Sequence, residues 1–291
     1  MFGFLIIAKP IDWTSHDVVS RVRRLLPRKT KVGHAGTLDP FADGVLVLGV
    51  GQATRLLDEV HHFPKTYRTT VTLGATSDTG DCTGEITPTP GDCSVPTAAE
   101  IEAALEPFRG EIDQVPPAHS AIHINGRRAY ELARAGEAVE MPTRRVTIHE
   151  LTLLRAEGLE VELEITCSTG TYIRAIARDL GEALGLGGYC SQLCRTAIGP
   201  FALTDGAEVE TLTAEEVPAA LLAPTMALTI PTLTLSEEDI TLLRHGKQIP
   251  WPEPISSRVA LLDESGALLA LAQPGESPTL LQPKKVFCIN P

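Results

Sequence analysis

The sequence has no long hydrophobic run, no closely paired cysteines and no overall excess of positive charge. No apolar run approaches the roughly 20 residues that a membrane-spanning helix needs, so we expect no membrane partner. The apolar patch at residues 4–8 is too short for a signal-peptide core and lacks a basic start, which predicts a cytoplasmic protein. The six cysteines include no CxxC pair, which argues against a disulfide framework and against a zinc site.

Negative charge dominates the chain, whose formal net charge is -12. Because RNA binding depends on Lys and Arg displacing counterions from phosphates, this balance alone argues against a nucleic-acid partner. The distribution argues the other way, since residues 1–70 hold ten Lys and Arg against six Asp and Glu. The densest cluster of basic residues is explained equally well by an RNA-binding face and by an ordinary solvated helix face. Its members are Arg21, Arg23, Arg24, Arg28, Lys29 and Lys31.

Hydrophobic periodicity predicts an α+β fold. Continuous apolar runs at residues 4–8 and 45–50 are typical of buried strands, whereas the alternation at 67–73 and 159–167 is typical of strands with one wet face. Helical spacing follows over residues 15–26, 97–105 and 173–184. Strands and helices thus mix without a strict βαβ rhythm, which favours a mixed, largely antiparallel central sheet with flanking helices.

The last quarter of the chain has a different pattern. Residues 203–230 alternate little and hold two prolines, so we expect a connector there. Ser236 then begins a capping box, and residues 259–262 are expected to pair with 268–271 as a hairpin. The sequence therefore predicts a large domain over residues 1–229 and a β-rich module over residues 230–291.

The densest motif, GHAGTLDPFADGVL, spans residues 33–46 and presents Asp39 in a glycine-rich loop that runs into a strand. Taken alone, an Asp before Pro in a loop is most often a turn residue. The segment nevertheless resembles the catalytic motif of the bacterial tRNA pseudouridine synthase B family, G-H-x-G-T-L-D-P-x-A-x-G-V-L, at every specified position.

The resemblance continues in order along nearly the whole chain. It implies the pseudouridine synthase fold, an RNA-gripping insertion around residues 120–145, and a small C-terminal RNA-binding barrel called a PUA domain. The segments that carry it are Lys9-Pro10, Thr14 to Asp17, Lys65 to Arg68, Leu73 to Asp81, Pro116-Pro117, Ser120-Ala121, Asn125-Gly126, Arg128 to Arg134, Cys167 to Arg174, Asp179 to Gly181 and Pro283 to Phe287.

The resemblance also implies an activity, the isomerisation of a uridine to pseudouridine at position 55 in the T-loop of tRNA. Asp39 would be the catalytic carboxylate that acts on a uridine flipped out of the RNA. One carboxylate suffices and no metal or organic cofactor is expected, because an isomerisation consumes neither water nor a redox equivalent. Arg174 would be its ion-pair partner and would hold Asp39 ionised in a dry pocket. Whether the base or the sugar is attacked stays open.

Four further residues are implied to bind the flipped nucleotide. Tyr67 would stack on the uracil, and Tyr172 and Leu193 would line the same pocket and exclude water. His34 would fill the gap that the extruded base leaves. Without the resemblance, each of these would be an ordinary core, strand or loop residue.

The sequence departs from the family pattern at four positions. His119 and His123 replace a frequent tyrosine and lysine, and Cys194 and Ala197 replace two arginines. We expect weaker or more salt-sensitive phosphate contacts as a result. The expected partner is the T-arm of tRNA, bound by a stand-alone protein that acts as a monomer without a guide RNA.

Other functions fit the sequence less well than this one. Asp78-Thr79-Gly80 matches the aspartic-protease triplet, but that chemistry needs two such carboxylates. Gly49-Val50-Gly51 lacks the third glycine of a dinucleotide-binding loop. A guide-RNA-dependent relative also remains open. The main competitor is a catalytically silent tRNA-binding or RNA-folding protein, and Asp39, Tyr67 and Arg174 argue against it.

Overall fold

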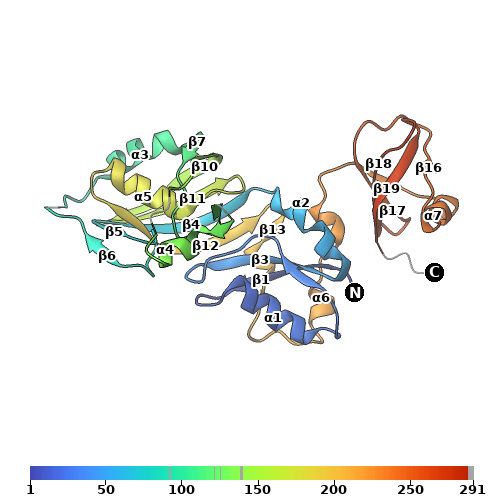
Figure 1. The fold of residues 1–291 in the computed structure, drawn as a ribbon, viewed down its shortest axis with the longest axis horizontal. Coiled ribbons are helices and arrows are strands. Elements are labelled where there is room, and N and C mark those ends of the chain that lie inside the picture. The colour runs from blue at the N-terminus through green and yellow to red at the C-terminus, as the bar shows by residue number, and fades with distance from the viewer. Residues whose placement is uncertain (92, 121, 125, 138–139, 288–291) are drawn as a thin grey trace.

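A computed structural model describes residues 1–91, 93–120, 122–124, 126–137 and 140–287, and the ribbon shows a large body followed by a smaller C-terminal one (Figure 1). Two positions of the expected insertion, Ala121 and Asn125, lie outside the described residues. No helix in the described part of the chain is both long and apolar enough to cross a lipid bilayer.

A ten-stranded sheet forms the large body. Only the β1–β14 and β3–β12 pairs are parallel, so the predicted mixed, largely antiparallel sheet is confirmed. Its main path runs β14 (Ala207–Glu208), β1 (Gly3–Lys9), β3 (Asp43–Val50), β12 (Gly188–Ile198), β4 (Lys65–Leu73), β11 (Glu160–Cys167), β10 (Arg144–Glu157) and β7 (Gly110–Gln114), with β2 (Val32–His34) beside β3 and β13 (Phe201–Ala202) beside β12.

Helices cover the sheet because each presents one apolar stripe to it. Helix α1 (Ser15–Leu25) lies within the predicted span 15–26, begins after the capping residue Thr14, and packs against β1 and β3. The η1 turn (Gly51–Leu56) and α2 (Leu57–His61) pack in a separate apolar cluster with β1 and β3 residues of the opposite face. Helices α3 (Ala98–Leu105) and α5 (Ile173–Ala183) pack against the half that contains β4 and β11.

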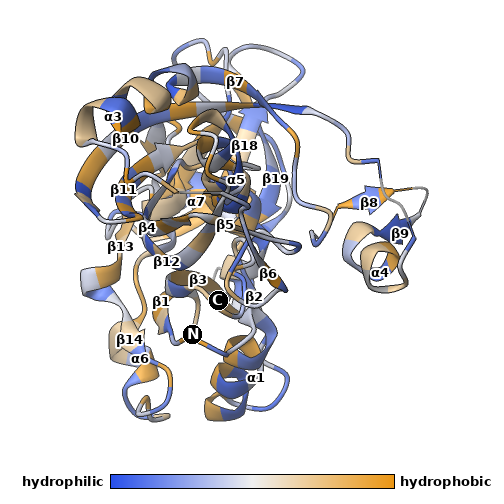
Figure 2. Cartoon of the chain, turned by 90° about the vertical axis from the view of Figure 1, so that its left-hand side faces the viewer, coloured by the Kyte–Doolittle hydropathy of each residue, from blue (hydrophilic) through white to orange (hydrophobic). Residues whose placement is uncertain are grey.

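A small hairpin unit stands away from the large body (Figure 2). It consists of β8 (His123–Ile124), β9 (Arg127–Arg128) and α4 (Ala129–Arg134). A second small hairpin, β5 (Ala75–Ser77) with β6 (Ile86–Pro88), also lies outside the main sheet. These units follow strands of the large sheet in sequence without joining it.

The expected connector is partly integral to the large body. Its elements are the short 3₁₀ turns η3 (Leu203–Asp205) and η4 (Pro224–Ala227), strand β14 and helix α6 (Val217–Ala220). Val209, Leu212 and Val217 are buried in the cluster under α1. The sequence did not reveal these contacts, because elements of only a few residues produce no clear hydrophobic periodicity.

The C-terminal body is a five-stranded sheet with one helix. Phe287 stacks on Phe2 with 5.3 Å between ring centroids, and an ion pair joins Arg258 to Glu59, so the two bodies are in contact. The strands run in the order β15 (Thr232–Thr234), β17 (Val259–Leu262), β18 (Leu268–Pro274), β19 (Leu280–Val286) and β16 (Ile249–Pro250), and helix α7 (Glu237–Arg244) starts at Ser236 as predicted.

Candidate functional site

Asp39 lies in the loop between β2 and β3, and contacts with helix α1 and with the hydrophobic core hold this loop in place. The buried hydroxyl of Ser15, at the start of α1, accepts a hydrogen bond from the Leu38 amide at 2.9 Å and lies 3.2 Å from the Leu38 carbonyl. Leu38 itself is buried in the core cluster under α5. The residue before Asp39 is therefore tied to both the helix and the core.

Lys9 holds the other side of the same loop. Its ammonium group, at the end of β1, donates to the carbonyls of Pro10 at 2.9 Å, Trp13 at 2.7 Å and Pro40 at 3.3 Å. Burial lowers the pKa of Lys9 to about 8, although the nearby Asp43 and Asp39 carboxylates oppose this shift. The residue after Asp39 is thus held by a cation that titrates near the physiological range.

Arg174 contacts the Asp39 carboxylate, as predicted. Its Nη2 lies 3.0 Å from Asp39 Oδ2, and its Nη1 lies 3.2 Å from Oδ2 of a second carboxylate, Asp81. The guanidinium also donates to the backbone carbonyls of Thr79 at 2.8 Å and His119 at 3.0 Å. A planar guanidinium can serve all four acceptors at once, which fixes its orientation.

Asp81 is a site residue that the sequence interpretation did not single out. Its side chain is 5% exposed, and its Oδ1 accepts from the Thr79 hydroxyl at 2.8 Å and from the Thr83 amide and hydroxyl at 2.9 and 2.6 Å. The triplet considered as a protease signature thus forms a turn that supports Arg174. Asp81 lies within a segment similar to the family, but no sequence pattern indicates that it contacts Arg174.

The three charged groups differ in their access to solvent. The Arg174 side chain is 6% exposed, whereas the Asp39 side chain is 37% exposed. Asp39 therefore reaches the surface while its partner lies beneath it. An RNA base can approach the carboxylate from the open side, and the water-poor environment expected for the reaction requires the bound RNA to cover it.

A second buried arginine, Arg195 on β12, also holds the loop and was not predicted as a site residue. Its Nε donates to the Val45 carbonyl at 2.8 Å, and its Nη2 donates to the Gly36 carbonyl at 3.1 Å. Its Nη1 lies 3.4 Å from the Thr37 carbonyl. Gly44 allows the backbone of β12 to pass close to β3 at Arg195, because a Cβ there would lie 2.3 Å from the Arg195 carbonyl oxygen.

Tyr67 and Leu193 lie on the same side of the sheet. Tyr67 on β4 is paired with Arg195, and Leu193 is paired with Thr69 two residues further along β4. Both pack in the cluster that contains Leu38. Burial raises the pKa of the Tyr67 hydroxyl, and the Asp39 carboxylate contributes to this while Arg195 opposes it. The structure therefore brings Tyr67, Leu193 and the Asp39 loop together.

Tyr172 precedes α5 and positions Arg174 through its backbone. The buried Gln114 side chain on β7 accepts from the Tyr172 amide at 2.8 Å and donates to the Tyr172 carbonyl at 3.1 Å. These bonds replace a side-chain cap, which the helix lacks. Gln114 is another residue that the sequence interpretation missed, since nothing in its neighbourhood distinguishes it from an ordinary strand residue.

His34 ends β2, one residue before the loop. Its Nδ1 is buried and has no hydrogen-bond partner among the described residues. Burial is the main cause that lowers the pKa of its imidazole. The ring is therefore mostly neutral near pH 7 and keeps one unused polar atom.

The four departures from the family pattern differ in their relation to the site. The backbone of His119, and not its ring, contacts Arg174, while His123 is exposed on β8. Cys194 lies beside Asp43, and burial together with this carboxylate raises its pKa to about 12. Ala197 pairs with Thr66 on β4. No described group of His, Cys, Asp or Glu side chains is arranged to hold a metal ion.

Comparison with known proteins agrees with the geometry. Residues 23–173 match the N-terminal domain of the TruB family pseudouridylate synthases. The tRNA pseudouridine synthase B of Thermobifida fusca is 43% identical over 279 residues, which cover 93% of this chain and 94% of that protein. The enzyme of the same name from Synechocystis is 42% identical over 300 residues, covering 99% of this chain and 100% of that protein.

Solved structures show the fold independently. A chain of the Cbf5-Nop10-Gar1 complex superposes with a TM-score of 0.73 at 24% identity and covers 99% of this chain and 85% of that one. A chain of the archaeal box H/ACA sRNP Nop10-Cbf5 complex gives a TM-score of 0.70 at 22% identity, with 98% and 86% covered. From its sequence match over nearly the full length, this chain belongs to the TruB family of pseudouridylate synthases.

Proposed function

We propose that this chain is the isomerase that converts uridine to pseudouridine at position 55 in the T-loop of tRNA. The observation that carries the proposal is the ion pair of 3.0 Å between Asp39 and Arg174, in a loop that matches the family motif. The curated relatives that cover more than nine-tenths of the chain are named tRNA pseudouridine synthase B.

The reaction exchanges one bond to the sugar for another. The bond from the ribose to N1 of uracil breaks, the base turns, and a new bond forms to C5, while the proton on C5 is lost and N1 gains one. Asp39 is the nucleophile or acid-base group of these steps. Arg174 holds the carboxylate in place, and Asp81 holds Arg174.

The remaining site residues bind the flipped nucleotide. Tyr67 stacks on the uracil, while Leu193 and Tyr172 complete the wall of its pocket. His34 occupies the gap left in the RNA by the extruded base. These roles follow from the family resemblance, and the shared location of Tyr67, Leu193 and the Asp39 loop supports them.

The direct test is incubation with an unmodified tRNA transcript, followed by mapping of pseudouridine at every uridine. We expect modification at a single T-loop uridine. A chain that binds tRNA tightly without forming pseudouridine would instead be the silent RNA-binding protein considered above. Modification at other uridines would contradict the position but not the chemistry.

We further propose a division of labour between residues 1–229 and 230–291, with the smaller part acting as a PUA-like RNA-binding domain. The hairpin unit around residues 120–145 would grip the RNA, which fits its position away from the sheet (Figure 2). Truncation is a poor test, because Leu271 and Phe287 pack in the same cluster as Phe4. Neutralising the exposed Lys284 is cleaner, and weaker RNA binding with unchanged kcat is expected.

The protein is proposed to act alone, as a cytoplasmic monomer that needs no guide RNA. The relatives that resemble it over nearly its full length at 42–43% identity carry the tRNA enzyme's name. Turnover of a bare transcript by the purified chain tests independence from a guide RNA. Light scattering of the same sample tests the monomer.

A further inference from the structure

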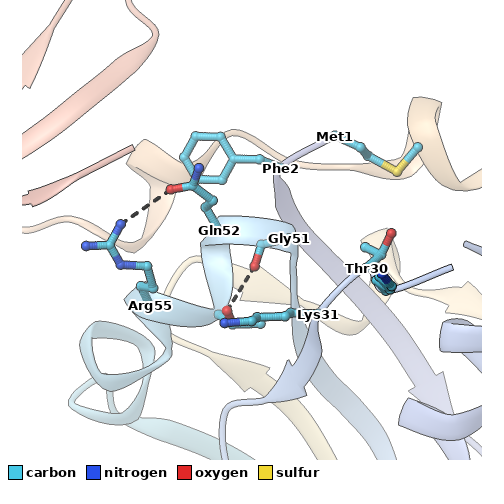
Figure 3. Close-up of a pocket in the computed structure, with 9 residues that line it drawn as sticks. Met1, Phe2, Thr30, Lys31, Gly51, Gln52 and Arg55 are labelled. Atoms are coloured by element: carbon cyan, nitrogen blue, oxygen red, sulfur yellow. Dashed lines mark hydrogen bonds between the residues drawn. The ribbon is translucent and has the colours of Figure 1, made fainter. Parts of the chain in front are cut away.

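A hollow of about 720 Å³ lies at the end of β1 and β3 that is remote from Asp39 (Figure 3). Its lining includes Lys29, Lys31, Gly51, Thr54 and Arg55, and none of the described residues that line it is acidic. We call it the distal basic pocket. In a chain with a net charge of -12, a local concentration of cations creates a positive potential that attracts an anionic ligand.

The cations of this pocket are available to a ligand. Lys29 and Lys31 are exposed, and within the described residues no ion pair or side-chain hydrogen bond engages either ammonium group. A smaller hollow adjoins the first and is lined by the same two lysines together with the exposed Arg23. The three side chains form one continuous positive surface.

The pocket is also held in a defined shape. Arg55 donates to the Val286 carbonyl at 2.6 Å and lies over the Phe287 ring, 5.2 Å from its centroid. Lys29 has a φ of 74°, in the left-handed region that favours glycine. Lysine adopts this conformation less easily than glycine does. Residues held in such a strained conformation often have a functional side chain.

The position of the pocket indicates what it can bind. Strand β3 runs from Asp43, near the Asp39 loop, to Val50, next to Gly51 in the pocket. At a rise of about 3.4 Å per residue, the two ends are about 24 Å apart. A flipped nucleotide at Asp39 therefore cannot reach the pocket, whereas a more distant part of the same RNA can.

We propose that the distal basic pocket binds backbone phosphates of the tRNA's helical arm, well away from the flipped base. The inference rests on the proposed function only in taking tRNA as the ligand. Lysine and arginine side chains at such a surface neutralise phosphates without reading sequence, so they position the RNA and add affinity. The pocket discriminates a full-length tRNA from a short stem-loop that carries the same loop.

The test uses two variants of the full chain, Lys29→Gly and Lys31→Gln, with Arg28→Gln as a control. Arg28 is an exposed cation next to the pocket in sequence but outside its lining. Because binding falls with salt by a power of about 0.9 per phosphate contact, each lost contact should reduce the rise in Kd from about 50 to 200 mM salt by roughly threefold. KM for full-length tRNA should rise with kcat unchanged.

A short stem-loop substrate should be turned over equally by the variants and the wild type. Lys29→Gly relaxes the left-handed backbone, so its thermal stability should not fall, and a loss of tRNA affinity cannot be blamed on unfolding. Unchanged Kd and salt slope on full-length tRNA would overturn the proposal, as would an equal loss on both substrates. If wild-type protein bound tRNA through these lysines without forming pseudouridine, the pocket would stand and the proposed function would fail.

Discussion

Two buried arginines hold the Asp39 loop from different elements, and they use different chemistry. Arg174 on α5 bridges two carboxylates, while Arg195 on β12 donates to backbone carbonyls of the loop and of β3. Among the described residues, Arg195 has no carboxylate within ion-pair distance. Arg174 therefore fixes the charge of the site, and Arg195 fixes the path of the chain that presents it.

This difference teaches how one loop can carry an accessible carboxylate without losing its shape. A charge partner alone would hold the tip of Asp39 but would leave the glycine-rich backbone free to move. Hydrogen bonds to the backbone alone would leave the carboxylate without a partner. Variants of Arg174 and of Arg195 should therefore separate the contribution of the charge partner from that of the backbone hydrogen bonds.

The largest effect is expected for Asp39→Asn, which removes the charge that Arg174 pairs with and that the braced loop presents. The isosteric change should lower kcat by roughly 10³-fold or more, because no other described carboxylate occupies its place. Binding of tRNA, followed by filter retention, should change little. Pseudouridine formation at a comparable rate would remove Asp39 from the mechanism.

Arg174→Lys should come next. A lysine keeps the charge but is a single point donor, so it cannot serve Asp39 and Asp81 together. We expect kcat to fall by about 10² to 10³-fold with little change in KM. Arg174→Met would in addition leave the buried Asp81 without a cation and cost about 3–5 kcal/mol of stability. Equal unfolding temperatures for the two variants would contradict the role given to Asp81.

Arg195→Met should have a smaller effect and should sharpen the comparison. It strands no carboxylate, but it leaves buried carbonyls of Gly36 and Val45 without a donor, at a cost of about 1–3 kcal/mol. A looser loop misplaces Asp39, so kcat should fall by about 10 to 10²-fold. The control is Arg68→Met on the neighbouring strand, where the side chain is 60% exposed and little should change. A loss as large as that of Arg174→Lys would refute the division between charge and chain path.

The smallest effect is a pH dependence at Lys9. Burial depresses its pKa from 10.5 to about 8, so between these values the unfolded chain binds more protons and this group's contribution to stability rises with pH. Activity should change in the opposite direction, falling a fewfold above pH 8, because a neutral amine has too few N–H groups for three carbonyls. Lys9→Arg should remove this part of the pH profile. An identical profile in the variant would assign the titration to another group.

Much of the fold follows from local sequence patterns. Helix α1 lies within the predicted span 15–26, the capping residue Ser236 begins α7 as predicted, and residues 259–262 pair with β18 as a hairpin. The contact between Asp39 and Arg174 was also predicted, but from family resemblance and not from physics alone. The short elements between residues 203 and 230 were missed because periodicity needs a longer window than they offer.

The sequence by itself determined where the longer helices and strands form, and the motif at residues 33–46 placed Asp39 in a glycine-rich loop. Only the tertiary structure decided that Asp81 and Gln114 support Arg174 and that Arg195 braces the loop. Buried polar groups acquire a role from their partners, and those partners lie far away in sequence. The glycine-rich motif is local in sequence, whereas the arginines that hold its backbone and satisfy its charge meet it only after folding.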